Sequence, residues 1–346
     1  MPSDTLDQLN KYPGTRFMGS KFKVLPEIEE VLKDVEFNSV LDAFSGSGCV
    51  SYLFKSMGKK VYSNDFMKYS HASTKALVEN DSVKLTPKDI DYLLNNKSSS
   101  RFISKTFQDL YFDKDDNKIL DRLFENTHKL RNPYKKAMAF SAISRAMIKR
   151  RPRGVFTYVG NKFDDGRKDL TYGLDRHFLE NVELFNNAVF SNGQQNVSTH
   201  GDIFDFDVKD TIDLVYFDPP YLSKSSDNDY VRRYHFVEGF VDGWKNVVID
   251  PATKTKKFPS YRSMFGSKTT IEQAFERLFF KFKDSTILLS YSSNSIPDKA
   301  HLVTMLEKIN KKVTVYEIDH IYSFGTHGHK LNNQTNRVKE YLFLAR

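Results

Sequence analysis

Short apolar runs that stop abruptly at glycine or proline recur along this chain, and helical patterns separate them. Residues 40–44 (VLDAF) form the first run, which breaks into Ser-Gly-Ser-Gly at 45–48. A helical pattern then continues to Gly58, a residue type that often follows the end of a helix. Residues 59–65 (KKVYSND) are again strand-like, and a further helical stretch extends to about residue 80. This alternation predicts a parallel sheet with helices on both of its faces.

The same alternation returns in the second half of the chain. Residues 213–217 (DLVYF) and 286–291 (TILLSY) have the pattern of buried strands, and the amphipathic segment 268–283 precedes the second of them. The last strands are predicted at 311–320 and 339–346. We therefore expect both halves of the chain to contribute strands to one α/β sheet.

The segment between these halves has a different character. Residues 83–195 are mostly helical in pattern, and a loop with Gly and Arg at 150–173 interrupts them. A length of 346 residues suggests two domains, or one domain with a large insertion. We expect an α/β domain formed by residues 1–82 and 196–346, with a helical insertion at 83–195. A smaller accessory insertion is expected at 222–266, which is polar, basic and aromatic and shows no clear period. Insertions of this kind usually carry specificity.

The composition excludes several classes of protein. Cys49 is the only cysteine, which rules out an intramolecular disulfide framework and a cysteine-based zinc cluster and favours a reducing cytoplasm. No run approaches the roughly 18 apolar residues of a membrane span, and the N-terminal segment lacks the apolar core of a signal peptide. Lys and Arg outnumber Asp and Glu by 52 to 44, giving a net charge of +8. This excess is compatible with a polyanionic partner and equally with a solvated basic surface.

The first strand leads into a glycine-rich turn, Asp42-Ala43-Phe44-Ser45-Gly46-Ser47-Gly48. Glycines allow the backbone to turn sharply and to approach a ligand closely. Alone, the turn is a weak signal of a ligand site. It does not complete the G-x-G-x-x-G motif of dinucleotide sites, because Ser51 stands where the third small residue would fall. Asp65 closes the second strand, where an acid can accept hydrogen bonds from ribose hydroxyls. A helix N-cap is the alternative interpretation of Asp65.

The motif Asp218-Pro219-Pro220-Tyr221 is much more specific. Two prolines directly after an apolar strand cannot continue a ladder, so they form a rigid turn at the carboxyl end of the sheet. That edge is where ligands bind in open α/β folds. Asp218 and a proline carbonyl can accept hydrogen bonds from the amino group of a heterocycle, while Tyr221 can stack on its ring.

Together these motifs resemble a known family. The order LDAFSGSG, SND, GDIF and DPPY, preceded by Arg16-Phe17-Met18-Gly19-Ser20-Lys21, is similar to that of the Dam-like N6-adenine DNA methyltransferases of the alpha motif order. The resemblance covers roughly residues 11–80 and 197–293. It implies a Rossmann-like methyltransferase sheet with a helical target-recognition domain inserted at 83–195. It also implies S-adenosylmethionine as methyl donor and a flipped adenine in double-stranded DNA as acceptor.

The resemblance assigns roles to individual residues. The catalytic residues that it implies are Asp218, Pro219, Pro220 and Tyr221. The cofactor-binding residues that it implies are Phe17, Lys21, Asp42, Phe44, Gly46, Gly48, Asp65, Asp202, Ile203 and Asp218. One departure is Phe17, where many relatives carry tryptophan, and we expect it to weaken stacking slightly.

The chemistry of an exocyclic amine agrees with this assignment. The lone pair of the adenine amine is delocalised into the ring, and hydrogen bonds to Asp218 and the Pro219 carbonyl favour a pyramidal nitrogen. The transfer is then a direct displacement, to which the protein contributes orientation and electrostatics. Methylation at carbon 5 of cytosine needs a thiolate nucleophile instead. Cys49 is the only thiol and lies outside any Pro-Cys motif, so we expect it to be a small buried helix residue.

Basic segments are the predicted contacts with DNA. Lys149, Arg150, Arg151 and Arg153 place four cations within five residues. Such cations can neutralise phosphates, and arginine can read guanine in the major groove. A second, weaker contact is expected from Arg232, Arg233, His235, Lys254, Lys256 and Lys257. His327 and His329 suggest a metal pair, but no nearby Asp, Glu or Cys completes a ligand set, so no metal is expected.

The sequence favours a cytoplasmic, DNA-associated modification enzyme of prokaryotic or phage origin, with a cognate restriction endonuclease as a possible partner and no membrane association. Methylation of RNA or of the cytosine N4 amine is the alternative within enzymes. Cytosine-amine enzymes more often carry Ser in place of the first Asp of the motif, which argues mildly against the second option. A catalytically inactive DNA-binding regulator is the alternative from another class, and the intact Asp65, Asp218 and Tyr221 argue against it.

Overall fold

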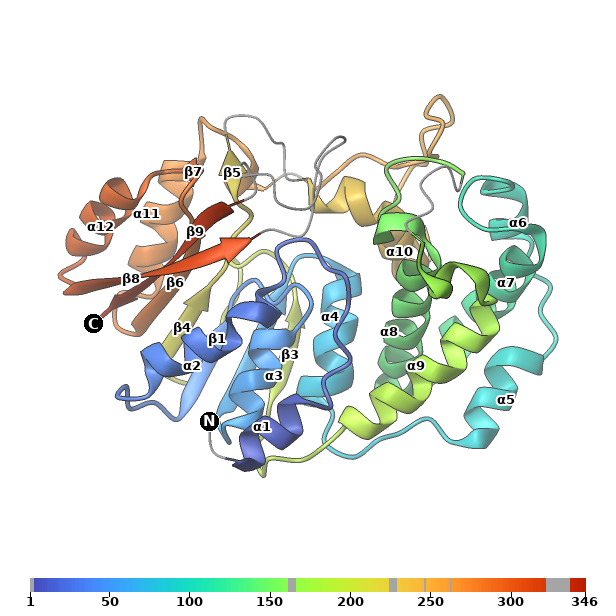
Figure 1. Cartoon of the computed structure of the whole chain (residues 1–346), viewed down its shortest axis with the longest axis horizontal. Helices are drawn as coiled ribbons and strands as arrows, with labels where there is room; N and C mark the ends of the chain where they lie inside the picture. Colours follow the sequence, from blue (N-terminus) through green and yellow to red (C-terminus); the bar gives the residue numbers. More distant parts are fainter. Residues whose placement is uncertain (1–2, 161–165, 224–228, 246, 262, 322–336) are drawn as a thin grey trace.

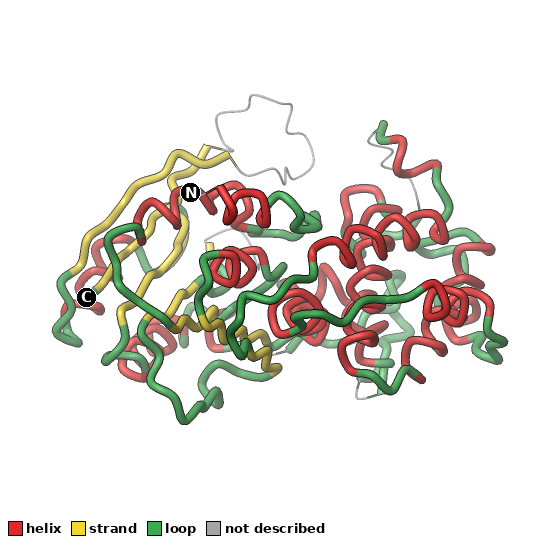
Figure 2. The backbone as a smooth tube through the Cα atoms, turned by 90° about the horizontal axis from the view of Figure 1, so that it is seen from below, coloured by secondary structure: helices red, strands yellow, loops and turns green. Residues whose placement is uncertain are grey.

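A computed structural model describes residues 3–160, 166–223, 229–245, 247–261, 263–321 and 337–346 of the chain. The strands gather in one part of the molecule, and a part built of helices lies beside it (Figures 1 and 2). Among the described residues, none of the helices has the length and apolar character needed to cross a membrane.

The strand-rich part contains a seven-stranded sheet with the order β3-β2-β1-β4-β6-β9-β8. Its strands are β1 (Ser39–Asp42), β2 (Lys60–Asp65), β3 (Val197–His200), β4 (Leu214–Phe217), β6 (Thr286–Ser292), β8 (Val313–Ile321) and β9 (Arg337–Ala345). The five strands from β3 to β6 pair in parallel, whereas β9 runs antiparallel to both β6 and β8. A separate short pair joins β5 (Leu222–Ser223) to β7 (Ser295–Ile296). Every strand predicted from the sequence is present, while β3 was not predicted.

Helices cover both faces of the sheet, as predicted. Val40 and Leu214 belong to one apolar cluster, and their neighbours Leu41 and Val215 belong to the other, because successive side chains in a strand point to opposite faces. The first cluster includes apolar residues of α2 (Leu25–Leu32) and α3 (Cys49–Ser56). The second includes those of α11 (Ile271–Lys281) and α12 (Lys299–Glu307). The fold is therefore an open α/β sheet with helices on both faces, which is the architecture that the resemblance implies.

Five helices form the helical part within residues 83–195. They are α5 (Pro87–Asn95), α6 (Phe102–Thr106), α7 (Lys114–Lys129), α8 (Pro133–Arg150) and α9 (Leu174–Ala188). Helix α8 starts at a strong signal, because the Asn132 side chain accepts from two backbone N–H groups and Pro133 occupies the first helical position. It packs against α9 and also against α4 (Lys68–Thr74) and the π-helix Lys75–Glu79 of the sheet part. Helix α8 therefore joins the helical part to the helices that follow β2 in the sheet part.

Segment 222–266, which shows no clear period in the sequence, contains regular structure among its described residues. Helix α10 (Tyr230–Asp242) lies in this segment, and most of its side chains are buried, including those of His235 and Glu238. A helix buried on most of its surface shows no apolar stripe, which is why no helical period is visible in this segment of the sequence. The N-terminal helix α1 (Ser3–Leu9) was also not predicted.

Candidate active site

A pocket lies at the carboxyl ends of β1, β2 and β4, which are neighbours in the sheet. Loops that follow adjacent parallel strands meet at one edge of the sheet and form a crevice there. The predicted residues that line this pocket are Phe17, Lys21, Asp42, Phe44, Gly46, Asp65, Asp218 and Pro220. The fold thus brings together residues from four separate segments of the chain, namely 17–21, 42–46, 65 and 218–220.

The glycine-rich turn after β1 is held in place by Asp65. Gly46 and Gly48 both have a positive φ, of 51° and 84°, which glycine adopts without steric cost. The Gly46 N–H donates to Asp65 Oδ2 and the Met67 N–H to Asp65 Oδ1, each at 2.8 Å. A Cβ atom at Gly46 would lie 3.0 Å from the ring of Phe17. Asp65 therefore fixes the turn, while the absence of a side chain at Gly46 leaves room for Phe17.

Asp42 presents an unused acceptor in the pocket wall. Its Oδ2 accepts from the Ser51 hydroxyl at 2.6 Å, while its Oδ1 and the Ser45 Oγ are buried without a hydrogen-bond partner. Burial raises the pKa of Asp42 to about 7. Buried polar atoms without partners are uncommon in proteins, so these two atoms suit a ligand with hydrogen-bond donors. An amino-acid moiety has such a donor in its ammonium group.

Asp202 and Ile203 lie beside this pocket but do not line it. The Gly201 N–H donates to the Asp65 carbonyl at 3.0 Å, which holds the end of β3 against the end of β2. The Asp202 side chain accepts from the Phe204 N–H, and Ile203 is buried in the apolar cluster of the second face. The structure thus places these two residues next to the predicted ribose acid.

Asp218 forms an ion pair with Lys21 at the inner end of the pocket. The Lys21 Nζ lies 2.8 Å from Asp218 Oδ1 and also donates to the Gly19 carbonyl at 3.0 Å. Burial raises the pKa of Asp218 to about 6, although Lys21 opposes this shift. The sequence predicted Lys21 as a cofactor residue, whereas the structure gives it a direct contact with the predicted catalytic carboxylate.

Tyr221 is packed more tightly than expected for a residue that stacks on a flipped base. Only 8% of it is exposed, and its ring contacts the Tyr291 ring at a centroid distance of 4.9 Å. The Lys21 Nζ lies 4.7 Å from the centre of the Tyr221 ring. Pro219 is buried, and Pro220 reaches the pocket surface. The described conformation therefore keeps Tyr221 within the protein.

Sequence reasoning missed Tyr230, the first residue of α10. Its ring stacks on that of Phe17 with centroids 5.8 Å apart, and Tyr230, Phe66 and Pro220 line both the pocket and a second cavity of about 610 Å³. Segment 260–270 forms much of the remaining wall of this cavity. No motif in the sequence signals this arrangement, because it depends on the position of α10.

Sequence reasoning also missed Glu340 on β9. This side chain is only 1% exposed and accepts from the Tyr221 hydroxyl at 2.5 Å. One signal in the sequence was available, because Glu340 is a single acidic residue at an inward-facing position of an apolar strand. A buried charge normally has a specific partner, so such a residue indicates a specific contact.

The predicted basic cluster is largely occupied by contacts within the protein. Arg151 is fully buried, and its guanidinium donates to the carbonyls of Tyr158 and Gly160, so the structure does not support a DNA contact for this residue. Arg150 pairs with Asp113 and Asp116 through N–O distances of 3.0 and 2.9 Å, and the Lys149 Nζ lies 3.5 Å from Asp169 Oδ1. These acids come from other segments and could not be paired from the local sequence. The Arg153 side chain lies outside the part that the structure describes.

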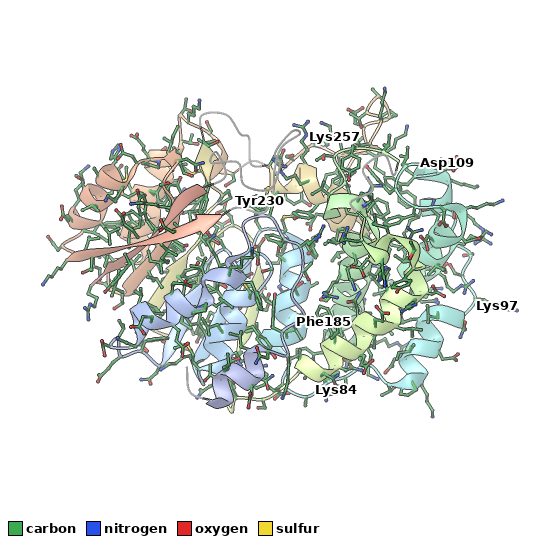
Figure 3. All side chains as sticks on the ribbon, viewed as in Figure 1. Lys84, Lys97, Asp109, Phe185, Tyr230 and Lys257 are labelled. Carbon is green, nitrogen blue, oxygen red and sulfur yellow. The ribbon has the colours of Figure 1, made fainter. Side chains whose placement is uncertain are left out.

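The second predicted basic group lies closer to the pocket. Arg232 is exposed and Arg233 half-buried in the first turn of α10, which begins at Tyr230. The Phe156 N–H donates to the Arg233 carbonyl at 3.0 Å, which joins the loop after α8 to α10. Figure 3 shows Lys257 on the same side of the molecule as Tyr230, in the upper part of the view. His235 was predicted to contact DNA. It is instead buried and contacts Tyr111, so this prediction was wrong.

The described residues contain no group of three or more His, Cys, Asp or Glu side chains that could hold a metal ion. His327 and His329 lie outside the described residues. Cys49 is buried at the start of α3, as predicted.

The pattern of fold and site is that of one family. The family model of D12 class N6 adenine-specific DNA methyltransferases matches residues 17–305, and the chain belongs to this family. The match includes both the glycine-rich turn and the Asp218–Tyr221 motif, so the predicted class of enzyme is confirmed.

Individual relatives agree with the family. Type II methyltransferase M2.HphI of Haemophilus parahaemolyticus is 31% identical over 97% of this chain and 98% of its own length. Modification methylase StsI of Streptococcus sanguinis is 25% identical over 85% of this chain, and type II methyltransferase M.FokI of Planomicrobium okeanokoites is 24% identical over 95%. The chain spans only 46% and 52% of the lengths of these last two proteins.

Proposed function

We propose that this chain is the modification enzyme of a type II restriction–modification system. It transfers a methyl group from S-adenosylmethionine to the N6 amine of one adenine in a specific double-stranded DNA sequence. The observation that carries the proposal is the position of Asp218, which shares one pocket with the glycine-rich turn and Asp65. A methyl donor and an amine acceptor can therefore meet beside this carboxylate.

The residues of the pocket fit the methyl donor. The unpaired Asp42 Oδ1 and Ser45 Oγ suit the donors of its amino-acid end, and Asp65 is close enough to the turn to contact the ribose. Phe17 forms an apolar wall of the same pocket. When bound, S-adenosylmethionine supplies an electrophilic methyl group on a sulfonium.

The protein orients the amine for attack. The Asp218 carboxylate and the Pro219 carbonyl accept its two N–H hydrogens and direct the nitrogen lone pair away from the ring plane. Hydrogen bonds to an ionised acceptor are about twice as strong as neutral ones, so the charge on Asp218 matters. Lys21 keeps that carboxylate in place. Fixing the geometry in this way is the main source of rate in a direct transfer.

DNA binds on the side of the molecule that carries Tyr230, Arg232 and Lys257. The second cavity opens beside Pro220 and Tyr230. An extruded base reaches Asp218 through this cavity. Extrusion costs a few kcal/mol, which phosphate contacts from Arg232, Arg233 and Lys254–Lys257 offset. We therefore assign the DNA contact to residues near α10 and not to the predicted Arg150 and Arg151.

Incubation of the purified protein with isotope-labelled S-adenosylmethionine and plasmid DNA tests the proposal directly. Nucleosides from the digested DNA should contain labelled N6-methyladenine, and sequencing with detection of modified bases should place it in one recognition sequence. Asp218→Ala serves as the control for contaminating activity. Label in N4-methylcytosine, or transfer to RNA but not to DNA, would contradict the proposed acceptor. Protection of the DNA against a nuclease encoded beside the enzyme tests the restriction partner.

A further inference from the structure

The carboxylate of Glu340 lies in the interior behind the catalytic turn. It is on β9, opposite Ser292 of β6, and is 1% exposed. Its Oε1 accepts from the Tyr221 hydroxyl at 2.5 Å and from the Ser290 hydroxyl at 2.7 Å. The same oxygen lies 3.6 Å from the Lys21 Nζ. One buried oxygen thus contacts both Tyr221 and Lys21.

A buried acid at this position is not needed to build the sheet. The residues around it on β9, Leu342 and Leu344, are buried apolar side chains, and an apolar residue of similar volume would avoid the cost of removing a charge from water. Buried ionised groups are retained where they have a specific partner. The partners of Glu340 belong to the proposed catalytic machinery, which suggests a role in the reaction.

Lys21 stands between two carboxylates at unequal distances. Its Nζ is 2.8 Å from Asp218 and 3.6 Å from Glu340, and the titratable groups with described contacts around Glu340 are Lys21 and Tyr221, with Asp218 beyond Lys21. Without the negative charge of Glu340, the attraction between the ammonium and Asp218 would lose this described competitor. Asp218 would then be a weaker acceptor for an amine, because more of its charge would be neutralised by Lys21.

We infer that Glu340 is a positioning residue for methyl transfer, which fixes the ring of Tyr221 and shares the ammonium of Lys21 with Asp218. The inference rests on the proposed function. Glu340 acts through these two neighbours and does not line the cofactor pocket. Its loss should therefore affect the transfer step and the handling of the base, and leave the binding of the methyl donor unchanged.

Glu340→Gln tests the inference, because it removes the charge and keeps the shape and one acceptor. We expect kcat to fall at least tenfold, with the affinity for S-adenosylmethionine by calorimetry within twofold of the parent. The acid limb of the pH–rate profile should move to lower pH, since the negative charge of Glu340 raises the pKa of Asp218. Glu317→Gln is the matched control, because Glu317 is an exposed carboxylate on the neighbouring strand β8. It should behave as the parent does.

Two further results decide the outcome. If Glu340→Gln does not fold, Tyr221→Phe tests the same contact, since it keeps the ring and removes only the bond to Glu340. That variant should lose signal from 2-aminopurine placed at the target adenine, which reports an extruded base, while still binding S-adenosylmethionine. A folded Glu340→Gln or Tyr221→Phe enzyme with parental kcat, pH profile and 2-aminopurine signal overturns the inference. A parent that forms no N6-methyladenine refutes the proposed function instead.

Discussion

Asp218 is expected to work best with its carboxylate ionised, because an ionised carboxylate accepts an N–H hydrogen bond more strongly than a protonated one. Burial raises its pKa to about 6. We therefore expect the rate of methyl transfer to fall as the pH drops through 6, well above the usual range of an aspartate. Single-turnover rates measured at saturating S-adenosylmethionine between about pH 5 and pH 8 check this. A rate that stays constant to the lower limit would show that Asp218 has an ordinary pKa or no role in the step.

Asp65→Ala should weaken the binding of S-adenosylmethionine by at least tenfold. The change removes the acceptor for the Gly46 and Met67 N–H groups, so the glycine-rich turn loses its anchor in addition to any ribose contact. Calorimetry on the folded variant measures the effect. Asp202→Ala is the comparison, because Asp202 lies outside the pocket and should change the affinity less. Equal affinities for the parent and Asp65→Ala would remove Asp65 from the site.

The predicted site residues whose placement in one pocket could be foreseen lie at the ends of strands, whereas contacts with distant partners could not be foreseen. Gly46, Asp65 and Asp218 stand at strand ends, where the topology alone brings them together. Lys21 was assigned to the cofactor, since nothing near it in the sequence indicates its ion pair with Asp218. Arg151 was assigned to DNA for a similar reason. Charge is visible in a sequence, whereas the burial of a charge is decided by tertiary contacts.

At the scale of elements, α10 is joined to the cofactor side of the sheet through Glu238. Its two carboxylate oxygens accept from the N–H groups of Lys68 and Tyr69, the first residues of α4, at 2.9 Å each. Negative charge is favourable at a helix N-terminus, and this one follows Asp65 within three residues. The helix that supplies Tyr230 is thereby fixed to the segment that supplies Asp65.

Glu238→Ala should lower the free energy of unfolding by about 2–4 kcal/mol, because two buried N–H donors lose their acceptor. Urea unfolding monitored by circular dichroism gives the difference. Glu183→Ala on α9 is the control, since that side chain is exposed and should shift the midpoint little. An unchanged midpoint in Glu238→Ala would mean that water replaces the carboxylate at no cost. We also expect Glu238→Ala to bind S-adenosylmethionine more weakly than the parent does.

Elements with a regular period or a clear stop signal could be predicted, and α10 could not. The glycine after α3 and the prolines after β4 mark their boundaries in the sequence. The sheet part, the helical part and segment 253–261 surround helix α10. Apolar and polar residues therefore occur on nearly all of its sides. Tyr234, His235 and Glu238 of this helix form long-range hydrogen bonds, so its pattern does not resemble that of a surface helix.

At the scale of the whole molecule, the surface that faces DNA is expected on the side of α10. Arg232→Ala should weaken binding to every DNA sequence and reduce the slope of log K against log salt by about one. Arg150→Ala is the matched control, because Arg150 is held by Asp113 and Asp116 and should affect unfolding more than DNA binding. Fluorescence anisotropy at several salt concentrations measures both. The opposite result, with only Arg150→Ala changing the slope, would return the DNA surface to the end of α8.

The place of β9 in the sheet has a consequence for the timing of synthesis. This strand is the last described element of the chain, yet it lies between β6 and β8 in the sheet. While the chain emerges from the ribosome, the glycine-rich turn and the Asp218 motif are complete long before residues 337–345 appear. Until then β6 and β8 keep open edges, which are prone to pair with other chains, and the catalytic turn lacks Glu340. A nascent chain therefore cannot close its sheet or bring Glu340 behind the catalytic turn until this strand is made.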